Sequence, residues 1–450
     1  MYLKRKIEGY LSEWKSNRNR LPLIIQGARQ VGKTFSIRKF AQENYDSVVE
    51  INFALHPEYK EIFAQGFKVD TIIRNISVLD NSLRFIPGHT LIFFDELQQC
   101  PNAATSLKAF REDGRYDVIC SGSLMGLNYK EIESNAVGNK SDLFMKPLDF
   151  EEFLWACGYD NTFIEGLYSD MLNLRPLTDA TMSVMLDLFN QYLILGGMPN
   201  VVKAYFLNDR NFQGTLQMQR DICRNYEEDI TKYAGSLDKG KILNVFRKIP
   251  IFLGKENKKF QITKVAHGAR SREYSGVVEW LVDSGIINIC YNLSQPELPL
   301  KANYNSDCFK IYFKDSGLLV SQLDEESQAD LRFNKNFSTY KGALYENIVA
   351  SMLDQEGYDL FYYRNEKGTL EMDFMVRDLE SVIPIEVKAK NGATASLNKL
   401  ISSDEYPEIH YGIKFCRQNI GFNGSFYTFP YFLVFLLKRF LRERSSIRTN

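Results

Sequence analysis

A phosphate-binding loop near the start of the chain constrains the fold more than any other feature. The stretch from Gly27 to Thr34 reads Gly-Ala-Arg-Gln-Val-Gly-Lys-Thr and matches the pattern Gly-x-x-x-x-Gly-Lys-Ser/Thr at every position. Glycines in such a loop let successive backbone N–H groups point at a phosphate, at the positive end of the following helix. An apolar strand is predicted before the loop at 21–25, and a helix after it at 34–44. The pattern therefore predicts an α/β fold that binds ATP.

Eight consecutive residues are expected to form the nucleotide cradle. They are Gly27, Ala28, Arg29, Gln30, Val31, Gly32, Lys33 and Thr34. Within this set, Lys33 is expected to reach the β- and γ-phosphates, and the Thr34 hydroxyl is expected to ligate Mg²⁺. The cofactors predicted from the loop are therefore ATP and Mg²⁺.

Polar side chains follow two further apolar strands. The strand predicted at 91–94 ends in Asp95, which is expected to hold the magnesium ion, and Glu96, which is expected to orient the attacking water. The strand predicted at 116–120 ends near Ser123, whose hydroxyl could contact the γ-phosphate or the attacking water. The alternative is that Ser121-Gly-Ser123 is a simple turn with no role at the nucleotide. Ligands bind at the carboxyl ends of parallel strands, so these side chains should lie near the loop.

Length and composition are typical of a soluble globular protein with several domains. The chain has 450 residues, of which 44% are hydrophobic and 25% are charged. Its formal net charge of −1 gives no overall sign of a nucleic-acid or membrane partner. The seven cysteines and four histidines show no metal-binding or disulfide-rich spacing, which predicts reduced thiols and no zinc site. Since we find no export signal or membrane span, we expect a cytoplasmic protein.

The order of predicted elements divides the chain into four parts. Strands alternate with helices over residues 1–150, which predicts a P-loop core built on a parallel sheet. Residues 151–233 are predicted to form a helical lid or connector. Short helices followed by a strand over 234–330 predict a winged helix, and a mixed α/β pattern occupies 331–450. The predicted fold class is a multidomain α/β protein.

The predicted winged-helix region contains a concentration of positive charge. Between Lys232 and Arg272 there are eleven basic residues and two acidic ones, in a chain whose net charge is −1. Such a surface would suit phosphate binding. Residues 261–266 and 271–283 resemble a helix-turn-helix, whose second helix could enter a DNA major groove. A solvated helical face or a protein-contact surface is the alternative.

A second group of charged residues is predicted in the last part of the chain. Glu386 and Lys388 lie two positions apart at the end of a predicted strand, so they project from the same face. Asp373 lies on the preceding predicted strand and can face them, and Glu346 lies on the helix predicted before both strands. The four residues are therefore candidates for one site.

This group could cut a phosphodiester bond. Asp373 and Glu386 could hold Mg²⁺, with Glu346 completing the site, while Lys388 could position or activate the attacking water. An Asp followed by Glu-x-Lys after a hairpin, with a helical Glu before them, resembles the arrangement of PD-(D/E)XK nucleases. The alternative is an exposed edge strand on which Glu386 and Lys388 form a surface salt bridge.

Taken together, these motifs resemble a family of prokaryotic AAA-type ATPases. In that family a P-loop domain precedes a winged helix and a restriction-endonuclease-like carboxyl-terminal domain. Other segments that carry the resemblance are 147–154, Gly196-Gly-Met-Pro199 and 341–347. The resemblance implies binding and hydrolysis of ATP, and it suggests DNA as a partner. A protein partner and a homo-oligomer remain open, and no membrane partner is expected.

The sequence leaves open which cation serves the phosphates. Phosphoryl transfer usually needs a positive group near the developing charge, and the candidates are Arg111, Arg115 and Arg220. Many members of the family carry Gly-Arg shortly after the strand that corresponds to the one predicted here at 116–120, where this chain has Gly138-Asn139. If that arginine serves ATP, hydrolysis here would rely on Lys140 or on another arginine.

Three functions are compatible with these features. The first is an ATPase whose nucleotide state controls a DNA-engaging, and potentially DNA-cutting, carboxyl-terminal half. The second is an ATP-dependent switch whose winged helix and degenerate nuclease fold bind a protein partner. The third is an ATP-driven DNA remodeller that does not cut.

Overall fold

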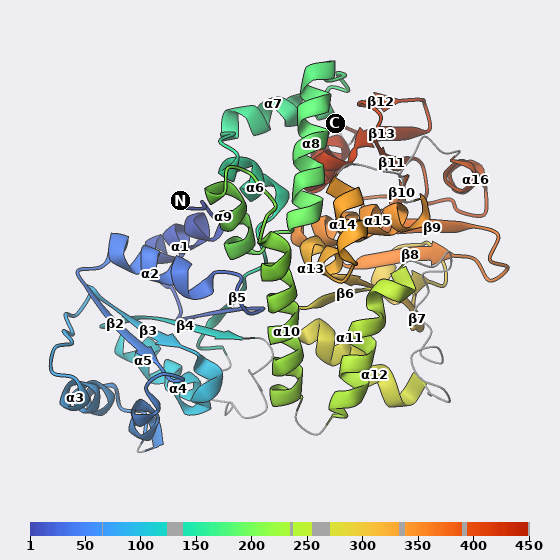
Figure 1. The fold of residues 1–450 in the computed structure, drawn as a ribbon. Coiled ribbons are helices and arrows are strands. Elements are labelled where there is room, and N and C mark those ends of the chain that lie inside the picture. The colour runs from blue at the N-terminus through green and yellow to red at the C-terminus, as the bar shows by residue number, and fades with distance from the viewer. Residues whose placement is uncertain are drawn as a thin grey trace.

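Figure 1 shows two α/β bodies on either side of a central group of helices. The amino-terminal body contains a five-stranded sheet and the carboxyl-terminal body an eight-stranded sheet. None of the helices that can be described is long and apolar enough to cross a membrane. The computed structural model describes residues 1–64, 66–123, 138–234, 237–253, 271–332, 338–388 and 394–448.

The amino-terminal sheet is parallel throughout, as the sequence predicts. Its strands are ordered β2-β3-β4-β1-β5. They are β1 (Leu23–Gly27), β2 (Ser47–Asn52), β3 (Thr90–Asp95), β4 (Asp117–Ser123) and β5 (Ser141–Phe144). Every residue of β1 and β3 is buried, because helices cover both faces of this parallel sheet.

Alternate residues of β1 show how the two faces are covered. Leu23 and Ile25 belong to the apolar cluster that includes α1 and α2, whereas Ile24 belongs to the cluster formed with α3, α4 and α5. Helix α2 begins at Lys33, immediately after the phosphate loop. The helices are α1 (Ile7–Ser16), α2 (Lys33–Asn44), α3 (Val69–Leu79), α4 (Pro101–Thr105) and α5 (Leu107–Asp113), with 3₁₀ turns η1 (Pro57–Ala64) and η2 (Leu97–Gln99).

The described middle part of the chain is helical. Helix α6 begins with a capping box, in which the Asp149 carboxylate accepts the Glu152 N–H at 2.8 Å and the Glu152 carboxylate accepts the Asp149 N–H at 3.1 Å. Pro199 opens α9, where its missing N–H has no cost. The helices are α6 (Phe150–Ala156), α7 (Asn161–Leu172), α8 (Asp179–Leu195), α9 (Pro199–Leu207), α10 (Thr215–Tyr233), α11 (Lys239–Leu253) and α12 (Ser271–Asp283).

The carboxyl-terminal sheet is mixed, with strand order β12-β13-β11-β10-β9-β8-β6-β7. Strands β9 and β10 form the antiparallel pair that the sequence predicts. The strands are β6 (Ile287–Leu293), β7 (Tyr304–Phe313), β8 (Leu360–Arg364), β9 (Glu371–Arg377), β10 (Val382–Val387), β11 (Gly412–Cys416), β12 (Gly421–Phe422) and β13 (Phe426–Pro430). The accompanying helices are α13 (Ser316–Ser321), α14 (Glu325–Arg332), α15 (Ser338–Gln355), α16 (Ala395–Ser402) and α17 (Leu437–Arg448), with 3₁₀ turns η5 (Leu300–Ala302) and η6 (Tyr431–Leu436).

The region predicted as a winged helix is continuous with this sheet. Strands β6 and β7 form an antiparallel hairpin after α12, as a wing would follow its helix. However, β6 also pairs in parallel with β8, so the hairpin forms one edge of the eight-stranded sheet. The first helix of the predicted helix-turn-helix, 261–266, lies outside the described residues, as do five of the eleven basic residues.

One apolar core extends from the helical middle into the carboxyl-terminal body. Phe189 of α8 stacks on Tyr345 of α15, with ring centroids 6.2 Å apart, and on Tyr431 of η6 at 5.8 Å. Phe150 of α6 contacts Phe435 at 5.8 Å. These ring contacts are favourable beyond the apolar area that they bury. They therefore fix the carboxyl-terminal body against α6 and α8.

Gly196 and Gly197 form a close backbone contact at the same junction. Gly196 has a φ of 68°, a conformation that residues with a Cβ rarely adopt. The Gly197 N–H donates to the Asp315 carboxylate at 2.6 Å, and its carbonyl accepts the Leu148 N–H at 2.7 Å. Asp315 also caps α13 by accepting the Leu318 N–H at 3.1 Å. The segment thus joins the end of α8 to α13.

Asp315 should make the stability of this junction depend on pH. Burial raises the pKa of its carboxyl from 3.8 to about 6, although hydrogen bonds from backbone N–H groups oppose that shift. Because the folded pKa lies above the unfolded one, the stabilisation is complete below about pH 4 and is lost as pH rises through about 6. The loss amounts to at most about 3 kcal/mol. Asp315→Asn should remove this part of the pH dependence.

Urea denaturation at pH values from 4 to 7 measures this effect. The difference in free energy of unfolding between wild type and Asp315→Asn should change by up to about 3 kcal/mol across that range. Asp324→Asn is the control, because hydrogen bonds from Ser327 lower the pKa of that exposed carboxyl instead of raising it. A difference that stays constant with pH would show that Asp315 does not titrate in this range.

Candidate active site

The phosphate loop lies between β1 and α2, where the sequence predicts it. Gly27 ends β1, and a Cβ on this residue would lie 2.3 Å from the backbone carbonyl oxygen of Met145. Gly32 has a φ of +97°, and Gln30 has a φ of 65°. Backbone N–H groups in such a left-handed turn can converge on an anion. The glycine at 27 is therefore required by close packing, and the glycine at 32 by conformation.

Lys33 lies inside the loop with its ammonium group on the loop backbone. It donates to the carbonyl oxygens of Gly27 at 2.9 Å and Ala28 at 2.8 Å. Burial lowers the pKa of Lys33 to about 8, against the opposing effect of the Glu96 and Asp95 carboxylates. A phosphate at this position would restore a favourable environment for the charged form.

Asp95 lies buried at the end of β3, surrounded by polar groups from neighbouring elements. Its carboxylate accepts hydrogen bonds from the Asn52 amide at 2.9 Å and from the Ser121 hydroxyl, and the Thr34 hydroxyl lies 3.3 Å away. The structure thus brings together Thr34 and Asp95, the two magnesium ligands predicted for the ATP site. Asn52 was not predicted, although a polar residue at the end of the neighbouring parallel strand is the signal that could have identified it.

Glu96 follows Asp95 in a left-handed conformation, with a φ of 58°. Such a conformation costs a non-glycine residue roughly 1–2 kcal/mol, so the surrounding structure must hold it. The Glu96 carboxylate accepts a hydrogen bond from the Gln98 side-chain amide N–H, and the Oε1 of the same Gln98 side chain accepts the Ser123 N–H at 3.2 Å. The Ser123 hydroxyl is buried and makes no hydrogen bond within the described structure.

Lys33 and Thr34 of the loop line a cavity of about 640 Å³ at the carboxyl edge of the sheet. Glu96 and Ser123 both face it. Arg111, Arg115 and Arg220, the cations proposed from sequence, are not among its lining residues and bond to groups outside the cavity. The cations that do line it are Arg5, Arg29, Lys33 and Lys203.

Arg5 came from neither motif nor spacing, whereas Arg29 was predicted as a residue of the loop and not as a cation for the phosphates. Arg5 donates to the backbone carbonyls of Val31 at 2.9 Å and Lys146 at 2.8 Å, and it forms a buried ion pair with Glu152 at 3.0 Å. These contacts hold the loop against the start of α6. Arg5 is therefore a structural support of the loop. The other cations that line the cavity outside the Lys33 position are Arg29 and Lys203.

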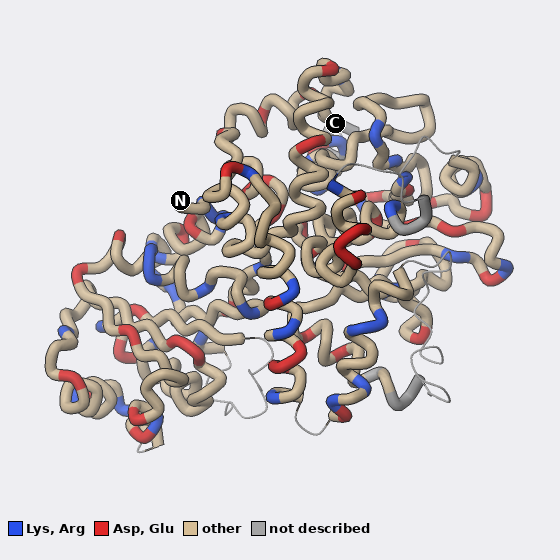
Figure 2. The backbone as a smooth tube through the Cα atoms, viewed as in Figure 1, with Lys and Arg blue, Asp and Glu red and all other residues tan. Residues whose placement is uncertain are grey.

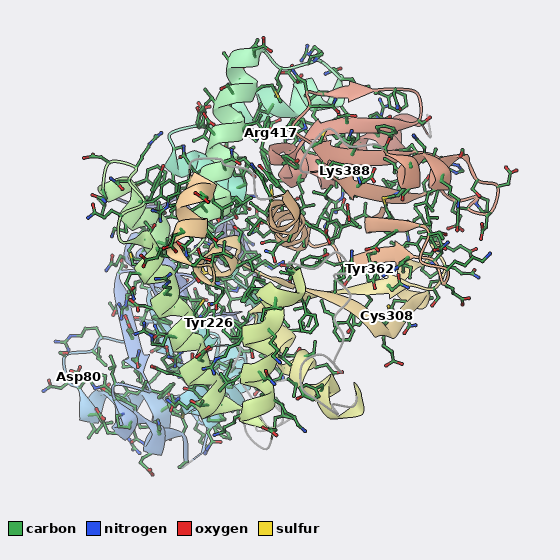
Figure 3. All side chains as sticks on the ribbon, turned by 45° about the vertical axis from the view of Figure 1, so that its right-hand side comes forward. Asp80, Tyr226, Cys308, Tyr362, Lys388 and Arg417 are labelled. Carbon is green, nitrogen blue, oxygen red and sulfur yellow. The ribbon has the colours of Figure 1, made fainter. Side chains whose placement is uncertain are left out.

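Arg29 connects the loop to α10. Its guanidinium Nε lies 2.8 Å from the carboxylate of Asp229, which is buried on that helix. Burial raises the pKa of Asp229, and the Arg29 charge opposes that shift. The Tyr226 hydroxyl, on the same helix (Figure 3), donates to the Arg29 carbonyl at 3.2 Å. A movement of Arg29 toward a phosphate would therefore change the charge balance on α10.

The loop residues fit a magnesium nucleotide. The Thr34 hydroxyl and the Asp95 carboxylate offer the oxygen ligands that Mg²⁺ prefers, and Lys33 offers a cation beside them. Magnesium in nucleotide sites needs few protein ligands, because phosphates and waters complete its shell. In the described part of the chain, no group of three or more His, Cys, Asp and Glu side chains could hold a metal ion by itself.

In the carboxyl-terminal body, Asp373, Glu386 and Lys388 lie together at β9 and β10. Lys388 Nζ is 2.8 Å from the Glu386 carboxylate, and the Asp373 carboxylate accepts the Val387 N–H at 2.8 Å. Glu386 is only 4% exposed. Strand β10 lies inside the sheet between β9 and β11, with Lys388 just beyond its end (Figure 3). The alternative is therefore wrong about an exposed edge strand, although the ion pair that it predicted between Glu386 and Lys388 is present.

A buried lysine that the sequence analysis did not single out joins Glu346 to this region. Lys310 of β7 is 1% exposed, and its Nζ lies 2.9 Å from Glu371 and 3.3 Å from Glu346. The Tyr312 hydroxyl donates to the same Glu346 oxygen. Burial lowers the pKa of Lys310, but the carboxylates of Glu346, Glu371 and Asp373 raise it well above its usual value. The available signal was a lysine within the otherwise apolar stretch 309–313.

Comparison with known proteins assigns the loop to a domain type. A family model described as an AAA domain matches residues 19–154. This part of the chain is an AAA-type P-loop domain. Two further models, both described as domains of unknown function, match residues 186–329 (DUF8612) and 341–431 (DUF4143).

More complete matches are distant. The uncharacterized protein MJ1544 of Methanocaldococcus jannaschii is 23% identical over 370 residues, which cover 78% of this chain and 71% of that protein. The Walker-type ATPase PABY2304 of Pyrococcus abyssi has 14% identity and a TM-score of 0.45, covering 71% of this chain and 96% of that one. The Aeropyrum pernix ORC1 protein, solved in complex with DNA, has 11% identity and a TM-score of 0.27, covering 73% and 92%.

Proposed function

We propose that the protein is a magnesium-dependent ATP hydrolase whose nucleotide state acts on its carboxyl-terminal half. The observation that carries the proposal is the convergence of Lys33, Thr34 and Glu96 on one cavity of an AAA domain, with Asp95 beside Thr34. A lysine, a hydroxyl and two carboxylates in these positions are the groups that phosphoryl transfer to water requires.

Each residue of the site has a proposed role. Thr34 and Asp95 would hold magnesium, which when bound neutralises charge on the β- and γ-phosphates. Lys33 would exchange its loop carbonyl contacts for phosphate oxygens, and Glu96 would orient the attacking water. The Ser123 hydroxyl, which is buried at the cavity wall, would donate to the γ-phosphate or to that water.

The proposed signal to the rest of the chain leaves through Arg29. An incoming phosphate would compete with Asp229 for the Arg29 guanidinium, which now lies 2.8 Å from that carboxylate. Asp229 is buried, so loss of its ion pair would be costly and would favour a change in the position of α10. Helix α10 is followed by α11 and α12, which belong to the region proposed to form the winged helix.

DNA is the proposed partner of the carboxyl-terminal half. The support is the basic stretch, the hairpin that follows α12, and the mixed sheet with a Glu-x-Lys group, which together suit a winged helix and a restriction-endonuclease-like domain. In Figure 2, acidic residues are interspersed with basic ones over both bodies. DNA binding would therefore depend on a local surface and not on the overall charge.

A protein partner is the second candidate for this half. It is favoured by one ion pair on the surface of the stretch, where the exposed Arg247 lies 2.7 Å from Glu227 of the same chain. A basic residue that is already paired with a carboxylate is less available to a phosphate backbone and suits a polar protein interface.

Magnesium-dependent ATP hydrolysis, measured with and without double-stranded DNA, tests the proposal. We expect hydrolysis by the wild type, stimulation by DNA, and loss of both in Lys33→Ala, because the phosphates lose their cation. Lys108→Ala, at an exposed lysine of α5, is the control and should behave as wild type. If the wild type binds ATP but does not hydrolyse it, the proposed hydrolase activity is wrong. If the wild type hydrolyses ATP at the same rate with and without DNA, a protein partner is favoured over DNA.

A further inference from the structure

The carboxylates of the carboxyl-terminal body are matched by cations of the same chain. Lys310 Nζ lies between Glu371, at 2.9 Å, and Glu346, at 3.3 Å. Lys388 Nζ pairs with Glu386 at 2.8 Å. Lys310 lies on β7 and Lys388 lies just beyond the end of β10, so strands of one sheet bring these charges together. We call these residues, together with Asp373, the carboxylate cluster.

The charges of the carboxylate cluster nearly balance. Its four carboxylates belong to Glu346, Glu371, Asp373 and Glu386. Three cations of the described residues lie against them, because Arg364 Nε is 3.7 Å from Glu371 in addition to the contacts of Lys310 and Lys388. A group with four negative and three positive charges has little electrostatic demand for a further divalent cation.

Lys310 is fixed in the cluster by burial as well as by charge. Its side chain is 1% exposed, and its Nζ lies 4.6 Å above the ring of Tyr362. Cys308 lies on β7 two positions from Lys310, and its thiol is 3.2 Å from the hydroxyl of Tyr362 on β8; both residues are labelled in Figure 3. A buried ammonium group is retained only where carboxylates or hydrogen bonds compensate its loss of water. Lys310 therefore cannot leave Glu346 and Glu371 without a large rearrangement of β7.

The predicted magnesium site does not fit this arrangement. Mg²⁺ needs oxygen ligands at about 2.0–2.1 Å in near-octahedral geometry. One carboxylate oxygen of Glu346, Oε1, accepts hydrogen bonds from both the Lys310 ammonium and the Tyr312 hydroxyl. A magnesium ion bound to this oxygen would therefore lie beside an ammonium group of like charge. One oxygen of Glu386 is buried without a hydrogen bond in the described structure. A single such oxygen falls short of the three carboxylates that the sequence predicts.

We infer that the Lys310 ammonium is the resident cation of the carboxylate cluster and occupies the place of the divalent ion next to Glu346. The carboxyl-terminal body accordingly has a nuclease-like arrangement of residues, and this cluster does not cut DNA through a metal ion. The inference is independent of the ATP site, because it rests only on residues of the carboxyl-terminal body, on β7, α15, β8 and β9 and at the end of β10.

Manganese binding to nucleotide-free protein tests the place of Lys310. Lys310→Met removes the ammonium group and leaves an apolar chain of similar length, so we expect one additional Mn²⁺ bound per chain by electron paramagnetic resonance. Lys314→Met is the control, because Lys314 is a partly buried lysine that lies 3.5 Å from Asp354, away from the cluster. Any Mn²⁺ at the phosphate loop is common to all three proteins. A folded Lys310→Met with no additional ion would overturn the inference.

A second measurement decides the matter even if Lys310→Met does not fold. Wild type and Glu386→Gln are incubated with supercoiled plasmid and Mg²⁺ or Mn²⁺, and nicking is followed on gels. We expect equal rates, whether zero or residual, because the cluster holds no catalytic metal. Cutting by wild type that falls at least tenfold in Glu386→Gln would overturn the inference, while leaving the proposed ATP hydrolysis untouched.

Discussion

Replacing Gly197 with alanine is expected to lower the free energy of unfolding by more than about 3 kcal/mol. A Cβ at this position would lie 2.0 Å from the Leu148 carbonyl oxygen and 2.8 Å from the Leu148 nitrogen. Both are backbone atoms, so no side-chain rotation can make room. Moving the backbone apart would break the hydrogen bonds that Gly197 makes with Leu148 at 2.7 Å and Asp315 at 2.6 Å. The clash and the lost hydrogen bonds therefore add.

Chemical denaturation of Gly197→Ala and of a matched control measures this cost. Gly166 lies inside α7, and a Cβ there would meet no atom within 4 Å. Gly166→Ala should therefore be neutral or stabilising by up to about 1 kcal/mol, because alanine is favoured over glycine in a helix. Equal stability of the two variants would show that the contact between Gly197 and Leu148 relaxes without cost.

The parts of the site that could be predicted from sequence are those encoded by neighbouring residues. The loop from Gly27 to Thr34 is contiguous, and Asp95 and Glu96 directly follow an apolar strand. Parallel strands bring such ends to one edge, which is why the loop and Asp95 meet as predicted. Asn52 needed one further fact, the order of the strands, because it lies beside Asp95 only through the pairing of β2 with β3.

The contacts that sequence reasoning missed join residues far apart in the chain. Arg29 and Asp229 are 200 positions apart, and nothing local in either segment indicates their ion pair. Lys310 reaches Glu346 and Glu371 because β6 pairs in parallel with β8, which places the β6-β7 hairpin beside the last part of the chain. Parallel pairing of distant strands has no turn signal between them, so its partners cannot be read from local pattern.

A substitution of Glu96 by glutamine should separate ATP binding from hydrolysis. We expect the rate of hydrolysis to fall by about 10² to 10⁴-fold, which is the usual contribution of a positioned acid–base group. Nucleotide affinity should change little, because Lys33 and Thr34 remain and the glutamine amide has nearly the size of the carboxylate. The side-chain oxygen of the new glutamine can still accept the Gln98 amide N–H while Gln98 keeps its bond from the Ser123 N–H, so the left-handed turn at this position should persist.

The measurement compares ATP affinity by calorimetry with the turnover rate at saturating ATP. Glu58→Gln is the control, since Glu58 is an exposed carboxylate of η1 outside the cavity lining. Hydrolysis by Glu96→Gln within about threefold of wild type would move water activation to another group, because a group that abstracts or orients a proton contributes far more than that. Loss of binding and hydrolysis together would instead mean that Glu96 supports the loop, most directly through the Lys33 ammonium, whose charged form the Glu96 carboxylate favours. Only retained ATP binding with slow turnover fits a carboxylate that activates the attacking water. The Glu96→Gln variant would then remain in its ATP-bound state, in which the proposed movement of Arg29 away from Asp229 can be observed directly.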